Sequence, residues 1–189
     1  MPEEMIKYYL SLGINKFCAG SAAQAKCIKN IDKTINVIGS ISMQVTRREI
    51  EENLQEYSTC FDGFVLPFKA SRDLQEIKKL PKNFYYILLV NAYCNIHCTG
   101  AHHWNYNYQD DKDIKCPGIY TGSSNSISWE DTARIRPMDL GFFDPYIYIY
   151  KLQDRGWPTA DIIRDYILYS NDYSIYPDIA YREEMYYGK

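Results

Sequence analysis

Short apolar runs recur along this chain at nearly constant spacing. The first four, rich in Ile, Val, Phe and Leu, are centred near residues 16, 38, 65 and 87, so successive centres lie 22, 27 and 22 residues apart. Segments with the apolar spacing of helices separate them. This pitch predicts consecutive strand–helix units in a parallel sheet.

Capping residues and periodicity define the expected elements. Thr46 and Glu49 form a capping-box pattern at one helix start, and Ser71 can cap the next helix, which Pro81 ends. In the last helix, one apolar face is expected to contain Ile162, Ile163, Tyr166 and Ile167. Expected strands cover residues 14–18, 34–41, 61–68, 84–91 and 146–152, and expected helices cover residues 2–12, 21–30, 46–57, 71–80 and 159–170.

Five such units indicate the α/β class and one domain over residues 1–189. A complete TIM barrel needs eight units in about 250 residues. We therefore expect an incomplete or truncated TIM-like (βα) barrel with about five parallel strands, or else an open α/β sheet. A long functional loop is expected over residues 92–144, and an irregular tail over residues 171–189.

Charge and hydropathy limit the partners and the cell compartment that we expect for this protein. A net charge of −3 and a pI near 5.6 give no support for nucleic-acid binding. No segment reaches the roughly 20 apolar residues that span a bilayer, and the start, MPEEMIKYYL, lacks the features of a signal peptide. We therefore expect a cytoplasmic protein without membrane contact, in which the six cysteines are thiols or metal ligands.

The loop 92–144 contains all three histidines and half of the cysteines. Loops this long within compact domains are usually functional or disordered. Thiolates and imidazoles gathered in one segment favour a metal site, although loop thiols without metal are the simpler alternative. The candidate ligands are Cys94, Cys98, Cys116, His102 and His103.

Two kinds of metal centre fit these ligands. Three cysteines and a histidine suit a closed structural zinc site, whereas three thiolates with an external fourth ligand suit a [4Fe–4S] cluster. The spacing of the cysteines does not decide between the zinc site and the iron–sulfur cluster. The usual radical-SAM spacing requires a third cysteine three positions after Cys98, where this chain has Ala101.

Polar residues also follow the expected strands, and the carboxyl ends of parallel strands meet at one edge of a sheet. Lys151 and Arg155 at the last strand end could bind an anionic substrate. The candidate substrate-binding residues are Ser40, Ser42, Lys69, Asn91, Lys151 and Arg155.

Two other sets of residues receive structural interpretations. Arg134 and Arg136, near Asp131 and Asp139, are expected to form ion pairs on the surface. Packing roles are expected for Cys27 and Cys60, and Cys18 at a strand end stays undecided.

The stretch NAYCNIHC, the R-P-x-D-L stretch and the sequence YKLQDRGWPTADIIRDYILYSNDY occur in that order. This order resembles the collagenase-like peptidase family, peptidase family U-32, loosely over residues 14–173. In that family a cysteine loop follows a barrel strand, and a Lys-x-x-x-Arg element leads into a helix that closes with a tyrosine. Here Lys151 to Arg155 matches the element, and Tyr166 or Tyr169 matches the tyrosine.

The resemblance implies an incomplete TIM-like barrel holding an iron–sulfur cluster. Family members are proteases, or take part in oxygen-independent hydroxylation of RNA or quinone precursors, so the substrate would be a peptide or an anionic small molecule. A thiol peptidase could instead use Cys98 with His102 or His103. A third alternative is a non-catalytic, degenerate barrel with structural zinc, which acts through a partner chain or a second copy that completes the barrel.

Overall fold

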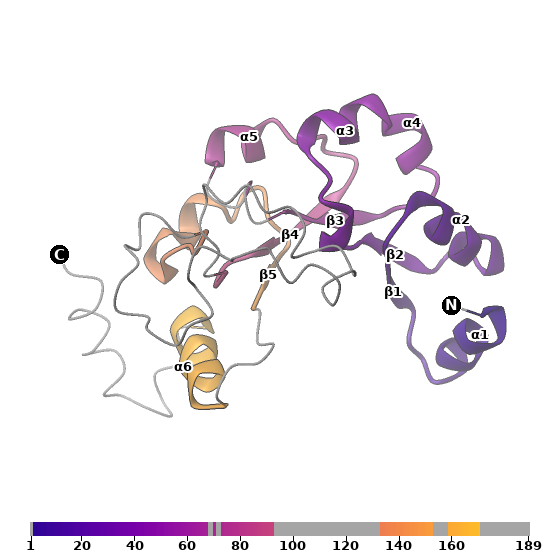
Figure 1. Ribbon diagram of the computed structural model, residues 1–189, viewed down its shortest axis with the longest axis horizontal. Coiled ribbons are helices and arrows are strands. Elements are labelled where there is room, and N and C mark those ends of the chain that lie inside the picture. The colour runs from indigo at the N-terminus through magenta and orange to yellow at the C-terminus, as the bar shows by residue number, and fades with distance from the viewer. Residues whose placement is uncertain (1, 68–69, 71–72, 93–132, 153–158, 171–189) are drawn as a thin grey trace, which may run out of the picture.

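A computed structural model of the chain describes residues 2–67, 70, 73–92, 133–152 and 159–170, and Figure 1 shows their arrangement. The strands are β1 (Lys16–Ala19), β2 (Asn36–Gly39), β3 (Gly63–Val65), β4 (Tyr85–Leu89) and β5 (Ile149–Lys151). The α-helices are α1 (Glu3–Ser11), α2 (Ala22–Ile31), α3 (Arg47–Glu52), α4 (Leu54–Tyr57), α5 (Leu74–Lys78) and α6 (Thr159–Ser170), and the 3₁₀ helices are η1 (Ile41–Met43) and η5 (Pro137–Phe142).

All five strands belong to one sheet in the order β1-β2-β3-β4-β5, and each neighbouring pair is parallel. The predicted α/β class and its five parallel strands are confirmed. Each strand lies beside the next one in the chain, so the order does not reverse within the described sheet as it does in doubly wound folds. This arrangement is compatible with a partial α/β barrel.

Local capping explains where the helices begin. The predicted capping box is present, since the Thr46 hydroxyl accepts from the Glu49 N–H and the Glu49 carboxylate accepts from the Thr46 N–H. The single helix expected over residues 46–57 is divided at Asn53 into α3 and α4. Asp73, rather than the predicted Ser71, is the N-cap of α5.

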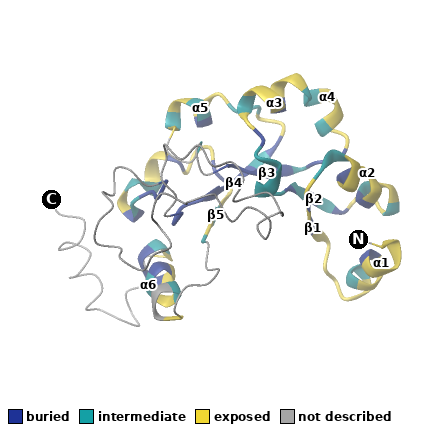
Figure 2. Cartoon of the chain, viewed as in Figure 1, coloured by how far each residue is buried: buried dark blue, intermediate teal, exposed yellow. Residues whose placement is uncertain are grey.

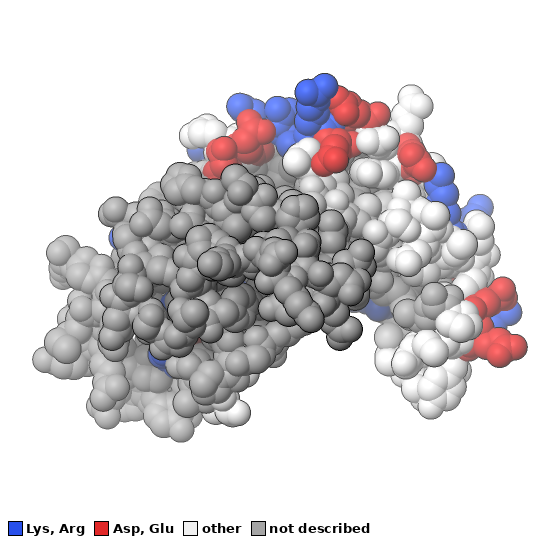
Figure 3. Space-filling view, in the orientation of Figure 1, with Lys and Arg blue, Asp and Glu red and all other residues white. Residues whose placement is uncertain are grey.

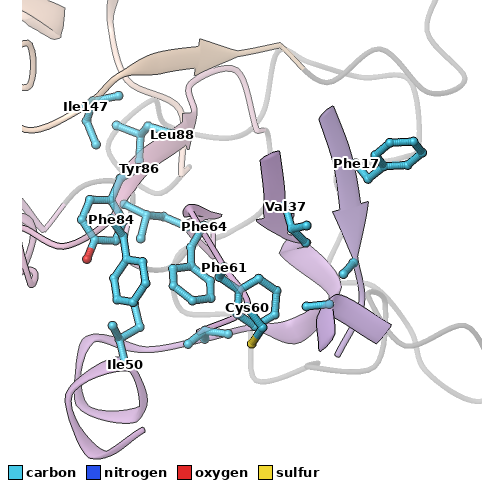
Figure 4. Close-up of a cluster of buried hydrophobic side chains, with 14 of the residues drawn as sticks. Phe17, Val37, Ile50, Cys60, Phe61, Phe64, Phe84, Tyr86, Leu88 and Ile147 are labelled. Atoms are coloured by element: carbon cyan, nitrogen blue, oxygen red, sulfur yellow. The ribbon is translucent and has the colours of Figure 1, made fainter. Parts of the chain in front are cut away.

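Buried residues of α1, α2, α3 and α5 pack against alternate strand residues and form the core with them; Figure 4 shows part of this core, and Figure 2 shows the burial along the chain. The Phe64 ring lies at its centre, 4.9 Å from the Phe61 ring and 5.0 Å from the Phe84 ring between centroids. Apolar burial and aromatic packing stabilise this layer. The strands contribute Phe17, Val37, Phe64, Tyr86 and Leu88, and the helices contribute Ile6, Ala25, Ile28, Ile50 and Ile77.

The outer surface of α3 and α5 carries charges of both signs (Figure 3). Arg47 on α3 pairs with Glu51 at 2.6 Å and with Glu76 of α5 at 2.7 Å. The hydrogen bond from Arg47 lowers the pKa of Glu76, so this link contributes above the ordinary pKa of a glutamate and is lost as the pH falls through the lowered value. Such an interleaved surface lacks the single-sign stripe that binds phosphate backbones.

Only part of the predicted loop 92–144 belongs to the described residues. Residues 133–144 contain η5, in which Pro137 occupies the first turn. Residues 93–132 and the predicted tail 171–189 lie outside the described residues. None of the helices that the structure describes has the length and apolar character needed to cross a bilayer.

Gly63 provides a test of the strand register. It lies opposite Tyr85 in the β3–β4 pair, and a Cβ at residue 63 would overlap the Tyr85 carbonyl oxygen. We expect Gly63→Ala to lower the free energy of unfolding by about 1–3 kcal/mol, because the neighbouring strand must shift. Gly141→Ala is the control, since its Cβ would meet no atom within 4 Å. Urea unfolding measures both, and equal stability of the two variants would contradict the register.

Candidate functional site

The carboxyl ends of β2, β4 and β5 contain four of the predicted substrate-binding residues. Ser40 caps η1, and its hydroxyl accepts from the Ser42 N–H at 3.3 Å. Lys151, the last residue of β5, is exposed, whereas Asn91 is buried just after β4. The parallel register places these residues at one edge of the sheet. The other predicted site residues lie outside the described residues: Lys69, Arg155, Cys94, Cys98, Cys116, His102 and His103.

A buried polar network lies at this edge. We call it the stem clamp; it consists of Asn91, Arg134, Asp165 and Tyr169. The Arg134 Nη2 donates to Asp165 Oδ1 at 2.9 Å, and the Asn91 Nδ2 donates to Asp165 Oδ2 at 3.0 Å. Asp165 on α6 thus binds one residue just before the segment 93–132 and one residue just after it.

The Tyr169 hydroxyl holds the backbone at the same two points. It lies 2.7 Å from the Ile135 carbonyl oxygen and 3.0 Å from the Val90 carbonyl oxygen. The Ile135 N–H donates to that Val90 oxygen at 2.8 Å. A phenol has one proton to donate, so the two carbonyls share it, while the phenol oxygen accepts from Arg134 Nε at 3.2 Å.

Burial makes the Arg134–Asp165 ion pair energetically important. The two side chains are 5% and 1% exposed, respectively. Each charge has lost most of its hydration and depends on its partner, so removal of one partner of such a pair typically lowers stability by about 3–5 kcal/mol. Arg164 lies farther away, with its Nη2 3.4 Å from Asp165 Oδ1.

One sequence-based interpretation of this network needs correction. Arg134 was expected in a surface ion-pair group, but it is buried because its partner Asp165 lies on a distant helix rather than nearby in sequence. The expected surface pair does form between Arg136 and Asp139, which are joined by two hydrogen bonds of 2.7 and 3.0 Å.

The buried side of α6 also differs from the expected apolar face. Ile163 and Tyr166 are exposed, and among residues 162–170 the buried ones are Asp165, Ile167 and Leu168. Of the two candidate closing tyrosines, Tyr169 is therefore the one that contacts the sheet.

A pocket of about 230 Å³ opens beside the stem clamp. Phe142 and Phe143 give it an apolar side, and Arg136 and Asp139 give it a polar side. Both Arg134 and Arg136 already pair with carboxylates, which reduces the attraction of this pocket for an anionic ligand. Its remaining lining residues are Leu74, Arg134 and Ile135.

The cysteines among the described residues differ in environment. Cys60 is buried in the core, as predicted, and desolvation raises the pKa of its thiol. Cys27 was expected to pack, but it is exposed because the buried side of α2 contains Ala25 and Ile28 instead. Cys18 on β1 is exposed.

Among the described residues, the structure contains no group of three His, Cys, Asp or Glu side chains close enough to hold a metal ion. The predicted cysteine and histidine ligands fall in residues 93–132, so the metal site stays a prediction. Comparisons of the chain with protein-family models, curated proteins and solved structures find no match.

The stem clamp predicts a large difference between two Asp→Asn substitutions. Asp165→Asn removes the carboxylate charge that pairs with buried Arg134, so we expect the free energy of unfolding to fall by about 3–5 kcal/mol. Asp139→Asn removes the partner of the half-exposed Arg136 and should lower it by about 1 kcal/mol or less. Circular dichroism during urea unfolding measures both, and losses of equal size would contradict a buried clamp.

Proposed function

We propose that this chain is a metal-binding protein of the iron–sulfur type, resembling peptidase family U-32. Cys94, Cys98 and Cys116 would hold a [4Fe–4S] cluster, with His102 and His103 as further nitrogen ligands. The observation that carries the proposal is the stem clamp, which fixes Asn91 and Arg134, on either side of the cysteine-containing segment, at one edge of a parallel sheet.

The position of the stems supports a functional role for the segment between them. Residues 90–91 directly follow β4, and residues 133–135 lie beside them although they are far away in sequence. In parallel α/β folds, binding and reactive groups gather at the carboxyl ends of strands because the following loops converge there. The described residues that flank the segment 93–132 therefore lie where such folds place their sites.

The consecutive strand order supports a partial TIM-like barrel. Its carboxyl-end rim would bind a peptide or an anionic small molecule, through Ser40, Ser42 and Asn91 and through the cationic residues Lys69, Lys151 and Arg155. The family resemblance makes peptide hydrolysis or oxygen-independent hydroxylation the expected reaction.

A second candidate function follows from the edges of the sheet. Each of β1 and β5 pairs with one strand in the described sheet, and exposed Tyr148 and Ile149 lie at the β5 edge. Uncovered edges and apolar side chains favour association. In this alternative the cysteine segment binds structural zinc, and a second copy or a partner chain completes the barrel.

Metal analysis tests the proposal. Protein purified without oxygen should contain iron and acid-labile sulfide, about four of each per chain for a [4Fe–4S] cluster. Cys94→Ala and Cys116→Ala should each lose both. Cys27→Ala is the matched control, because this exposed thiol on α2 lies outside the proposed ligand set. Zinc at about one per chain would favour the structural alternative, and a parent protein without metal after reconstitution would overturn both.

A further inference from the structure

The pocket of about 230 Å³ beside the stem clamp is lined from two parts of the fold. Residues 134–143, which contain η5, supply most of its lining, and Leu74, the first residue of α5, supplies the rest. All of these residues belong to the part of the chain that the structure describes. An apolar cavity of about 150 Å³ can hold benzene, so this pocket has room for one ring with a small substituent.

Hydrogen bonds hold the lining of the pocket in place. The Ile135 N–H donates to the Val90 carbonyl oxygen at 2.8 Å, which fixes one side to the end of β4. The Tyr150 hydroxyl lies 3.0 Å from the Leu140 carbonyl oxygen, which fixes η5 to β5. A site that is ordered before its ligand arrives loses less conformational entropy on binding.

The apolar side of the pocket includes one aromatic ring that the fold leaves largely uncovered. Ile135 and Phe143 are buried in the core, whereas Phe142 is 65% exposed. A ring that enters the pocket can pack against Phe142 in an offset or edge-to-face arrangement, which adds to the free energy gained from apolar burial. The apolar side therefore favours an aromatic ligand.

The polar side of the pocket carries no net charge. Arg136 donates through Nε and Nη2 to the two carboxylate oxygens of Asp139, and Arg134 pairs with Asp165. Within the described part of the chain, no group accepts a hydrogen bond from Arg136 Nη1, so its two N–H groups are available to a ligand. An anion would also meet the Asp139 carboxylate, whereas an uncharged amide can accept from Arg136 and donate to Asp139.

We infer that this pocket is a binding site for a small, uncharged aromatic amide. The ring would lie against Phe142 and the buried apolar residues, and the carboxamide would lie against Arg136 and Asp139. The inference goes beyond the proposed metal-binding function and does not depend on it, because the lining includes none of the proposed metal ligands or rim residues.

The first test compares two ligands of the same shape and different charge, 4-fluorobenzamide and 4-fluorobenzoate, by ¹⁹F NMR titration of the full chain. We expect the amide to bind with a Kd of about 1 mM or lower, at least about fivefold more tightly than the carboxylate. Asp139→Asn should raise the affinity for 4-fluorobenzoate about tenfold, because it leaves the planar guanidinium of Arg136 free to bind a carboxylate.

Phe142 and Met138 offer a matched pair of alanine substitutions. Both lie on η5 and are similarly exposed, at 65% and 63%, but only Phe142 lines the pocket. We expect Phe142→Ala to weaken the binding of 4-fluorobenzamide at least about fivefold, and Met138→Ala to leave it within about twofold of the parent's. Substitutions at such exposed positions usually change stability little, and circular dichroism confirms that each variant folds.

Several outcomes would overturn the inference. They are no binding of 4-fluorobenzamide to the parent protein, tighter binding of 4-fluorobenzoate by the parent, and equal weakening by the two alanine substitutions. A protein without metal that still binds the amide would overturn the proposed function and support the pocket, so the two proposals fail separately.

Discussion

The contact on which the rest of this structure depends is the buried ion pair between Arg134 and Asp165. A charge pair so little exposed has lost most of its hydration, and it is tolerable only when its remaining hydrogen-bonding capacity is used. Asn91 on the second carboxylate oxygen and Tyr169 beside the guanidinium supply that. The hydrogen bonds consequently restrict the positions of all four side chains. They also restrict how α6 packs against the end of β4.

A different kind of interaction stabilises the helix-covered face of the sheet. Phe64 and its neighbours are stabilised by apolar contact, which has no strict direction and tolerates modest changes of shape. The network at the carboxyl end is directional, because each oxygen must find its donor. The core of the protein thus tolerates modest changes of side-chain shape, whereas the network at the carboxyl end of the sheet requires strict hydrogen-bond geometry. Such a division is common where a scaffold supports a site.

Sequence alone was sufficient for the features that depend on near neighbours. The first four strands follow from the spacing of apolar runs, and the start of α3 follows from Thr46 and Glu49, which interact three positions apart. The break at Asn53 could not be predicted, because the helical pattern continues through it.

The stem clamp could not be predicted from the sequence, and the reason is physical. The expected apolar face of its helix, Ile162, Ile163, Tyr166 and Ile167, does not include Asp165. Its partners lie 31 and 74 positions away, and a single sequence does not show which distant charges meet. A hint was nevertheless present: Arg134 lies between Ala133 and Ile135, an apolar setting that is unusual for a surface arginine.

The 74-position separation between Asn91 and Asp165 also affects how this protein is made. A ribosome adds about 5–20 residues per second, so β4 leaves the exit tunnel roughly 4–15 s before α6 can follow. Throughout that interval the end of β4 must do without Asp165, although the apolar layer from β1 to β4 has already been synthesised. The nascent chain therefore passes through a stage in which the strands from β1 to β4 are present but the carboxylate that joins Asn91 to Arg134 is not.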